Sequence, residues 1–180
     1  MRILIISDSH GYNDPLRTVI QREKPDMMIH LGDSQYSQAE IAKWAGAPKT
    51  PCVFVRGNCD TDCDPELVRD AAVFELKGHK FYCAHGHREH IDMGLLRISL
   101  AAQELGCDIC MFGHTHVPYD SFGEAVSKFN RFYGGDSSAS WPRLLNPGSI
   151  SIPRGGSGNS YMIMEMEDDG RYEVKFCLLN

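Results

Sequence analysis

Residues 2–10 read Arg-Ile-Leu-Ile-Ile-Ser-Asp-Ser-His, and this stretch decides the fold. Its first part is a short apolar run, which is typical of a strand buried on both faces. The polar residues that follow interrupt the run at once, so it is too short for a signal peptide. Asp8 and His10 therefore stand directly after a buried first strand, at the position where a strand can deliver polar side chains to a site.

The same alternation of apolar runs and polar ends continues along the chain. The predicted elements are strand 2–7, helix 14–22, strand 27–31, helix 38–46, strand 52–55, a hairpin over 72–84, helix 92–105, strand 108–112 and a closing hairpin over 161–178. Strands that alternate with helices predict a layered α/β domain with a largely parallel central sheet. Residues 119–143 are rich in glycine, serine and aromatic residues, and we expect a loop or an irregular insert there.

Composition limits the possible functions. The 180 residues fit a single domain over 1–180, with 42 % hydrophobic and 23 % charged residues. The formal charge of −6 argues against a partner such as duplex nucleic acid, whose phosphates an acidic surface repels. A small phosphate ester remains possible, because bound divalent cations would reverse the local field.

The chain shows no sign of a membrane segment or a disulfide framework. No apolar run reaches the ~18 residues that span a bilayer, so we expect no membrane association. The seven cysteines are odd in number and scattered, which indicates reduced thiols and predicts a cytoplasmic location.

Polar clusters recur where predicted strands end. In open α/β sheets, ligands bind at the edge where the strands have their carboxyl ends, so residues remote in sequence can converge there. The candidate metal ligands at five such ends are Asp8, His10, Asp33, Asn58, His85, His114 and His116. Carboxylate, imidazole and amide groups suit hard or borderline divalent metals without a thiolate.

Seven ligands are too many for one tetrahedral zinc, but they suit two metals that share a bridging carboxylate, for which Asp33 is the candidate. Two metals ~3.5–4 Å apart can clamp a phosphoryl group, and a hydroxide that bridges them can attack phosphorus.

Each cluster also has an ordinary structural interpretation. Asp8 and His10 could serve a turn or a helix cap, and Gly57-Asn58 could be a simple turn. A single His85 would more often be structural. His114 and His116 are a stronger pair, because alternate residues at a strand end point the same way. The joint occurrence of all the clusters, in order and at strand ends, favours the metal site.

The ordered clusters resemble the signature of the calcineurin-like metallophosphoesterases. The resemblance covers residues 3 to about 156, and the motifs that carry it are Asp8-Ser9-His10, Gly32-Asp33, Gly57-Asn58-Cys59-Asp60, His85-Gly86-His87 and Gly113-His114-Thr115-His116. The Gly-Asn-Cys-Asp motif and Asn146-Pro147-Gly148-Ser149 are similar to those of the small YfcE-type phosphodiesterases.

The resemblance implies a four-layer α/β/β/α sandwich and two metal sites. By motif position, one metal would be held by Asp8, His10, Asp33 and His116, and the other by Asp33, Asn58, His85 and His114. The family commonly works with Mn²⁺, while Fe, Ni or Zn can occupy such sites. Small members often form dimers or tetramers, so a homo-oligomer is expected as a possible partner arrangement.

The motif Asn58-Cys59-Asp60 supplies the candidate catalytic residues. Many members of the superfamily have a histidine in place of Cys59, which contacts the phosphoryl group and helps the leaving group depart, and Asp60 would orient that histidine. A thiol is a weak hydrogen-bond donor, so we expect activated phosphodiesters to be better substrates than esters with basic leaving groups. Cys59 could instead be a small packed residue. Arg154 is a candidate substrate-binding residue, although a surface role is as reasonable.

The stretch 119–143 looks longer than is usual for small members of the family. Its large aromatic residues are Phe122, Phe129, Phe132, Tyr133 and Trp141. They could line a substrate pocket, form a subunit contact or cover the second sheet, and we expect packing on that sheet first.

Three functions compete. The first is a metal-dependent phosphodiesterase. The second is a phosphomonoesterase or a nucleotide pyrophosphohydrolase that uses the same metal site. The third is a non-catalytic protein-binding scaffold, because a retromer subunit resembles these enzymes although its metal-binding residues are partly replaced. Here every ligand position holds a residue that can coordinate metal, which favours an enzyme.

Overall fold

The computed structural model describes residues 1–122 and 141–179. Its helices are α1 (Asn13–Glu23), α2 (Gln38–Ala45), α3 (Leu96–Glu104) and the short 3₁₀ helix η1 (Ile91–Met93). Its strands are β1 (Arg2–Ile6), β2 (Met27–His30), β3 (Cys52–Val55), β4 (Val68–Arg69), β5 (Ala71–Leu76), β6 (His79–Ala84), β7 (Ile109–Met111), β8 (Pro118–Phe122), β9 (Arg143–Pro147), β10 (Ser160–Met166) and β11 (Tyr172–Leu178).

The strands form two mixed sheets. The first sheet has the order β11-β10-β1-β2-β3-β4, in which β1 to β4 are parallel, β10 is antiparallel to β1, and β11 is antiparallel to β10. The second has the order β5-β6-β7-β9-β8, with β6, β7 and β9 parallel and antiparallel strands at both edges. The alternation of strands and helices had predicted one central sheet, so this expectation was wrong about the number of sheets.

Strand β1 shows why the sheets stack. Successive side chains of a strand point to opposite faces. Ile3 and Ile5 enter the core between the two sheets, whereas Leu4 and Ile6 enter the core shared with α1 and α2. All four are completely buried, and each such side chain stabilises the fold by about 1.5–3 kcal/mol.

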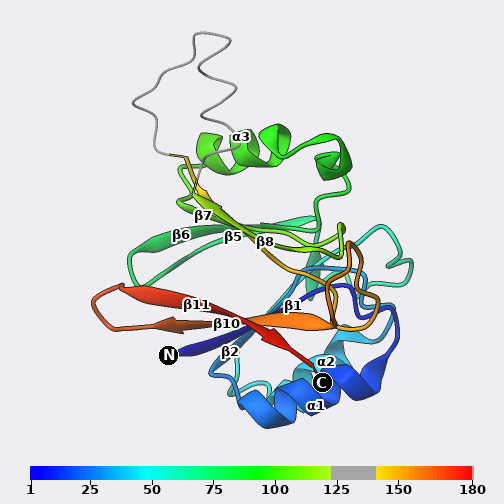
Figure 1. Ribbon diagram of the computed structural model, residues 1–180. Coiled ribbons are helices and arrows are strands. Elements are labelled where there is room, and N and C mark those ends of the chain that lie inside the picture. The colour runs from blue at the N-terminus through cyan, green and yellow to red at the C-terminus, as the bar shows by residue number, and fades with distance from the viewer. Residues whose placement is uncertain (123–140, 180) are drawn as a thin grey trace, which may run out of the picture.

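The second sheet repeats this arrangement. Phe81 on β6 and Ile109 on β7 face the core between the sheets, while Tyr82 and Cys110 pack with α3 on the other face. Figure 1 shows the resulting layers, with α3 above the two sheets and α1 and α2 below them. The four-layer α/β/β/α sandwich implied by the resemblance is thus confirmed.

Two predicted elements have different limits in the structure. The helix expected over residues 92–105 is interrupted, because Gly94 has a φ of 135° that no helix allows and separates η1 from α3. Residues 119–122 were expected to be irregular, yet they belong to β8, which pairs antiparallel with β9. Every helix in the described part of the chain is too short or too polar to cross a membrane.

The described aromatic residues of the stretch 119–143 do not pack as expected. Phe122 is 69 % exposed, and the Arg143 guanidinium carbon lies 4.4 Å from the centre of its ring. Packing on the second sheet is therefore wrong for Phe122, because its partner is a cation and not a core. Trp141 is half-buried. Phe129, Phe132 and Tyr133 lie outside the described residues.

Candidate metal centre

The seven candidate ligands follow the carboxyl ends of five strands. Asp8 and His10 follow β1, Asp33 follows β2 and Asn58 follows β3, all in the first sheet. The second sheet contributes the others, with His85 after β6 and both His114 and His116 after β7. The residues were expected at one sheet edge. They come instead from the edges of two stacked sheets, which place them face to face.

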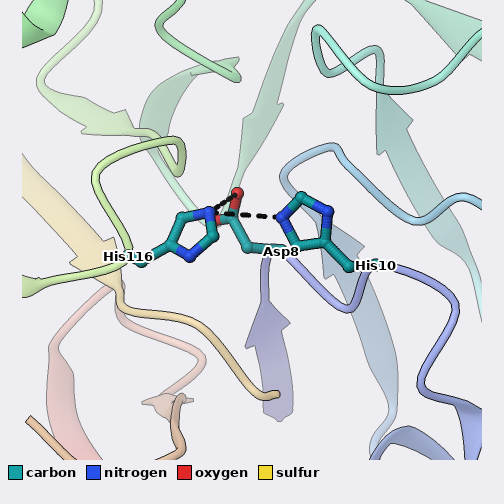
Figure 2. A group of neighbouring side chains, drawn as sticks. All are labelled: Asp8, His10 and His116. Carbon is teal, nitrogen blue, oxygen red and sulfur yellow. Dashed lines mark hydrogen bonds and ion pairs between the residues drawn. The ribbon is translucent and has the colours of Figure 1, made fainter. Parts of the chain in front are cut away.

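The first cluster consists of Asp8, His10 and His116, which Figure 2 shows converging from two loops. The Nε2 atoms of His10 and His116 are 3.2 Å apart. His116 Nε2 is also 3.2 Å from Asp8 Oδ1. These three residues belong to the set that the resemblance assigns to one metal.

The second cluster consists of Asp8, Asp33 and His85. His85 Nε2 lies 3.4 Å from Asp33 Oδ2 and 3.9 Å from Asp8 Oδ1. Asp33 Oδ2 is also 3.7 Å from His10 Nε2 in the first cluster. Asp33 thus reaches both clusters, as a bridging carboxylate must, and Asp8 does so as well.

Asn58 and His114 complete the second side of the site. Asn58 Oδ1 is 3.2 Å from His85 Nε2, and the rings of His85 and His114 have centroids 5.1 Å apart. His114 and His116 were expected to point the same way because they alternate. They diverge toward different clusters, because β7 ends at Met111 and the backbone of both histidines is left-handed.

The hydrogen bonds of three histidines fix which ring nitrogen faces the centre. His85 Nδ1 donates to the Leu31 carbonyl at 2.7 Å and His116 Nδ1 donates to the Ile152 carbonyl at 2.6 Å. His10 Nδ1 donates to Gln35 Oε1 at 2.8 Å. In the neutral rings each Nε2 atom is left with a lone pair, so these atoms are prepared as metal ligands.

The centre therefore gathers acceptors that have no proton to share. Asp8 Oδ1 is buried and accepts no hydrogen bond from any described residue. Around it stand the lone pairs of three imidazoles and the oxygens of Asp33 and Asn58. Buried acceptors in such proximity repel one another unless a cation lies among them. This donor set fits divalent metal ions of the kind that the sequence predicts.

The pKa values point in the same direction. Burial lowers the pKa of His85, but the hydrogen bond to Asp33 and the charges of Asp8 and Asp33 outweigh it, so its pKa is raised. The pKa of His116 is raised for the same kind of reason, with Asp8 as the partner. Burial raises the pKa of Asp33, yet the bond and charge of His85 and the Cys59 N–H lower it overall. The cluster attracts positive charge, which either protons or metal ions can provide.

The glycines that precede the ligands allow the loops to approach closely. A Cβ atom on Gly57 would lie 1.9 Å from Asp33 Oδ1, and one on Gly113 would lie 2.0 Å from Ser7 Oγ. Contacts of that length are impossible, so the loops after β3 and β7 need glycine at these positions to reach the first-sheet loops.

Asp60 lies behind the site and organises it. Its carboxylate accepts hydrogen bonds from the backbone N–H groups of Asp33, Gln35 and Gly57 at 2.8, 2.8 and 2.9 Å, and from the Ser34 hydroxyl at 3.2 Å. Asp60 is therefore a positioning residue, because it fixes the loop that carries Asp33.

Cys59 lies against the ligands. Its N–H donates to Asp33 Oδ1 at 2.7 Å, and its thiol is grouped with the ligand atoms of His10 and Asp33. Burial and then the charge of Asp33 raise the pKa of the thiol to about 11. The thiol is consequently neutral near pH 7 and can act only as a weak donor.

Arg154 lies next to the first cluster but is exposed. Its backbone N–H donates to the His116 carbonyl at 3.2 Å, and its charge acts to lower the pKa of His116. That Arg154 binds the substrate stays a prediction.

Three supporting residues were missed in the sequence. Gln35 orients His10, as described above. Asn146 Nδ2 donates to the Gly113 carbonyl at 2.7 Å, and Ser149 Oγ donates to the Asp8 carbonyl at 2.8 Å. The sequence did show the motif Asn146-Pro147-Gly148-Ser149. Its hydrogen bonds to two ligand loops are visible only in the three-dimensional structure.

Known proteins are similar to this chain in sequence. The chain is 33 % identical over 171 residues to the probable metallophosphoesterase YsnB of Bacillus subtilis, which covers 94 % of this chain and 86 % of YsnB. It is 24 % identical over 184 residues to the phosphodiesterase YfcE of Escherichia coli K12, covering 92 % and 88 % of the two chains.

Solved structures agree in fold. A Streptococcus pneumoniae TIGR4 protein described as a predicted phosphoesterase has a TM-score of 0.74 at 28 % identity, covering 98 % of this chain and 88 % of that one. A variant of Vps29 from Entamoeba histolytica has a TM-score of 0.66 at 17 % identity, with both chains fully covered. At that identity the likeness to Vps29 concerns the fold alone.

The family comparison agrees with the ordered motifs and with the geometry of the centre. The model of the calcineurin-like phosphoesterase superfamily domain matches residues 1–169. The chain therefore belongs to the calcineurin-like phosphoesterase superfamily.

Proposed function

We propose that the protein is a metal-dependent phosphodiesterase that uses two divalent cations, with Mn²⁺ as the expected metal and Fe, Ni or Zn as alternatives. The observation that carries this proposal is the convergence of three imidazole Nε2 atoms and the carboxylates of Asp8 and Asp33, with every histidine Nδ1 of that group committed to an oxygen acceptor.

The ligands divide into two sets that meet at Asp33. Asp8, His10, Asp33 and His116 would hold one ion, and Asp33, Asn58, His85 and His114 would hold the other. When bound, such a pair of ions would supply Lewis-acid stabilisation of the phosphoryl oxygens and would lower the pKa of a nucleophilic water.

The other residues prepare the ligands and the substrate. Gln35 and the carbonyls of Leu31 and Ile152 hold the imidazoles in the tautomer that ligation requires. Asp60 keeps the Asp33 loop in place. Arg154 would meet the phosphate from the solvent side. Cys59 offers a neutral thiol, which supports a leaving group poorly, so the substrate should be an activated or intrinsically labile diester.

The competing functions differ in what they require of the centre. A phosphomonoesterase or nucleotide pyrophosphohydrolase would use the same ligands and differ only in the surrounding pocket. A protein-binding scaffold would need neither the oriented tautomers nor the unpaired Asp8 oxygen. The proposed substrate is a small phosphate ester, with neither duplex nucleic acid nor a membrane as partner.

Hydrolysis of bis(p-nitrophenyl) phosphate with and without Mn²⁺ tests the proposal. Asp33→Ala and His114→Ala should each lower kcat/KM by at least about 10³-fold, because each removes a ligand of the reacting centre. Asp14→Ala, which removes an exposed carboxylate on α1, should retain wild-type activity. Circular dichroism shows whether the variants are folded. Full activity of either ligand variant after metal removal would refute a metal-dependent reaction.

A further inference from the structure

Three sizeable cavities lie among the described residues, and one of them adjoins the metal centre. A cavity of about 520 Å³ is lined by residues in and after α1 and α2 and contains no candidate ligand. The largest of the three, about 1040 Å³, is lined by residues around the hairpin turns, such as Lys77, Arg143 and Arg171. Each of these cations is already paired, with Asp168, Asp120 and Asp169 respectively. None of the residues that line this cavity is a candidate metal ligand.

The cavity that adjoins the metal centre has a volume of about 380 Å³, and two of its lining residues contact candidate metal ligands. Its lining includes Gln35 and Cys59. Gln35 accepts the hydrogen bond from His10, and the Cys59 N–H donates to Asp33. A group in this cavity would therefore lie beside the ligands. That position suits one of the two ester groups of a diester bound at the centre.

The charge of this cavity is acidic. Its lining contains Asp60 and Asp62, and neither a lysine nor an arginine occurs among the residues that line it. The Asp60 carboxylate is occupied by the loop hydrogen bonds described above, so it has little capacity left for a ligand. Asp62 is exposed and places a negative charge at the lining, where it would repel a further phosphate.

An aromatic wall limits the cavity on another side. Tyr36 lines the cavity and stacks on Trp44, with ring centroids 5.3 Å apart and planes inclined by 27°. Trp44 does not line the cavity, and the Arg17 guanidinium carbon lies 4.1 Å from its ring centre. This stack holds Tyr36 in place, so its ring offers an ordered apolar surface to a ligand.

We propose that this cavity binds the retained ester group of the substrate, and that it selects a neutral or cationic group which can pack on Tyr36. Phosphodiesters with such a group are then the substrate class, and esters that carry a further anionic group, such as nucleoside polyphosphates, are rejected. The proposal rests on the phosphodiesterase function proposed above, because it assigns a specificity pocket to the same centre.

A matched series of p-nitrophenyl phosphodiesters tests the charge preference. The retained group is 2-(trimethylammonio)ethyl, 2-hydroxyethyl or 2-carboxyethyl, so the leaving group is the same throughout. In the wild type, kcat/KM should be higher for the cationic than for the anionic ester. Asp62→Lys should lower the ratio of these two values at least about tenfold, because it changes the local charge by two units. Glu66→Lys reverses an exposed charge outside the lining and should leave the ratio within about twofold.

A second comparison tests the aromatic wall. Tyr36→Ala should lower kcat/KM about fivefold for bis(p-nitrophenyl) phosphate relative to methyl p-nitrophenyl phosphate, whereas Tyr36→Phe should preserve the wild-type ratio. If the wild type cleaves these diesters with Mn²⁺ but neither Asp62→Lys nor Tyr36→Ala changes its ratio, the pocket assignment is wrong and the phosphodiesterase function stands. If the wild type cleaves none of them, both proposals fail.

Discussion

Five of the seven candidate ligands have a left-handed backbone. The φ angles of Asp8, His10, Asp33, His114 and His116 lie between 45° and 64°. Such a conformation costs a non-glycine residue of the order of 1–3 kcal/mol, although aspartate and histidine tolerate it better than most. Hydrogen bonds from Asp8 N to the Gly32 carbonyl and from His10 N to the Asp33 carbonyl hold two of these turns. The left-handed backbone of the ligand loops directs several side chains toward the centre, and the loops store strain as a result.

Among the described glycines, Gly57 leaves the least room for a Cβ atom, so Gly57→Ala should disrupt the centre. Gly57 does not have a left-handed backbone, so alanine is excluded by the space alone: its Cβ would lie 1.9 Å from Asp33 Oδ1 and 2.3 Å from the Asp33 backbone nitrogen. A shift of about 1 Å in a catalytic group lowers activity by a factor of the order of 10². We expect a loss of that size in kcat/KM, and titration calorimetry should show weaker Mn²⁺ binding.

Gly158→Ala is the matched control. A Cβ there would meet only the Leu178 side chain at an ordinary 3.4 Å, and its backbone is likewise outside the left-handed region. This variant should retain wild-type activity. If the activity of Gly57→Ala were within threefold of the wild type, the Asp33 loop could move away from the new Cβ atom without loss of activity.

At the scale of secondary structure, the sequence predicted elements that have a strong apolar pattern. The runs at residues 2–7 and 27–31 became β1 and β2, because buried central strands need apolar side chains on both faces. Strand β8 was missed, since it is an edge strand that begins with Pro118 and has two adjacent polar residues, Asp120 and Ser121, in its middle. Its strand character comes from pairing with β9, which local sequence does not reveal.

The first residue of β6, His79, pairs with the Asp108 carboxylate, and this pair should make the stability of the fold depend on pH. Burial lowers the pKa of His79, but the Asp108 side chain and the Gly170 carbonyl raise it overall by accepting hydrogen bonds from its ring. A raised folded pKa means that the stabilisation is complete below the unfolded value of about 6.5 and is lost as pH rises through the folded pKa.

His79→Gln isolates this contribution. Asp108 is half-exposed, so the pair should stabilise the fold by roughly 0.2–1 kcal/mol and no more. Urea unfolding at pH 5.5 and at pH 8.5 measures the free energy at both ends of the window. The wild type should lose more stability than His79→Gln on going to pH 8.5, while the other titrating groups cancel between the two proteins. Equal losses of stability in the two proteins would mean that the His79 imidazole is not charged in the folded state.

At the scale of the whole molecule, the sequence predicted which residues meet at the centre, but it did not predict that they come from two separate sheets. Apolar runs mark strand ends, and the identity of the ligands follows from the residues found there. The number of sheets does not follow from strand order, because β5 to β9 could have extended the first sheet equally well. That residues 1–180 form one domain stays a prediction.

Because the ligands come from both sheets, metal ions at the centre would join the two halves of the sandwich. Asp8, His10, Asp33 and Asn58 belong to loops of the first sheet, and the remaining histidines belong to the second. Without metal, the buried carboxylates of Asp8 and Asp33 repel each other, and the neighbouring histidines and the backbone N–H groups of Cys59 and His114 compensate for them. Metal binding should therefore stabilise the entire fold, and not only the loops that contact the ions.

Thermal unfolding with and without Mn²⁺ measures this effect. At a Mn²⁺ concentration about 100 times the dissociation constant, one bound ion adds about 2.7 kcal/mol of stability. For a chain of this size that corresponds to a rise in Tm of roughly 5–10 °C, which a chelator should reverse. Asp33→Ala should show little of the rise, because it lacks the carboxylate that reaches both ligand clusters. If Mn²⁺ raised the Tm of Asp33→Ala as much as that of the wild type, the ion would be binding somewhere other than between the two sheets.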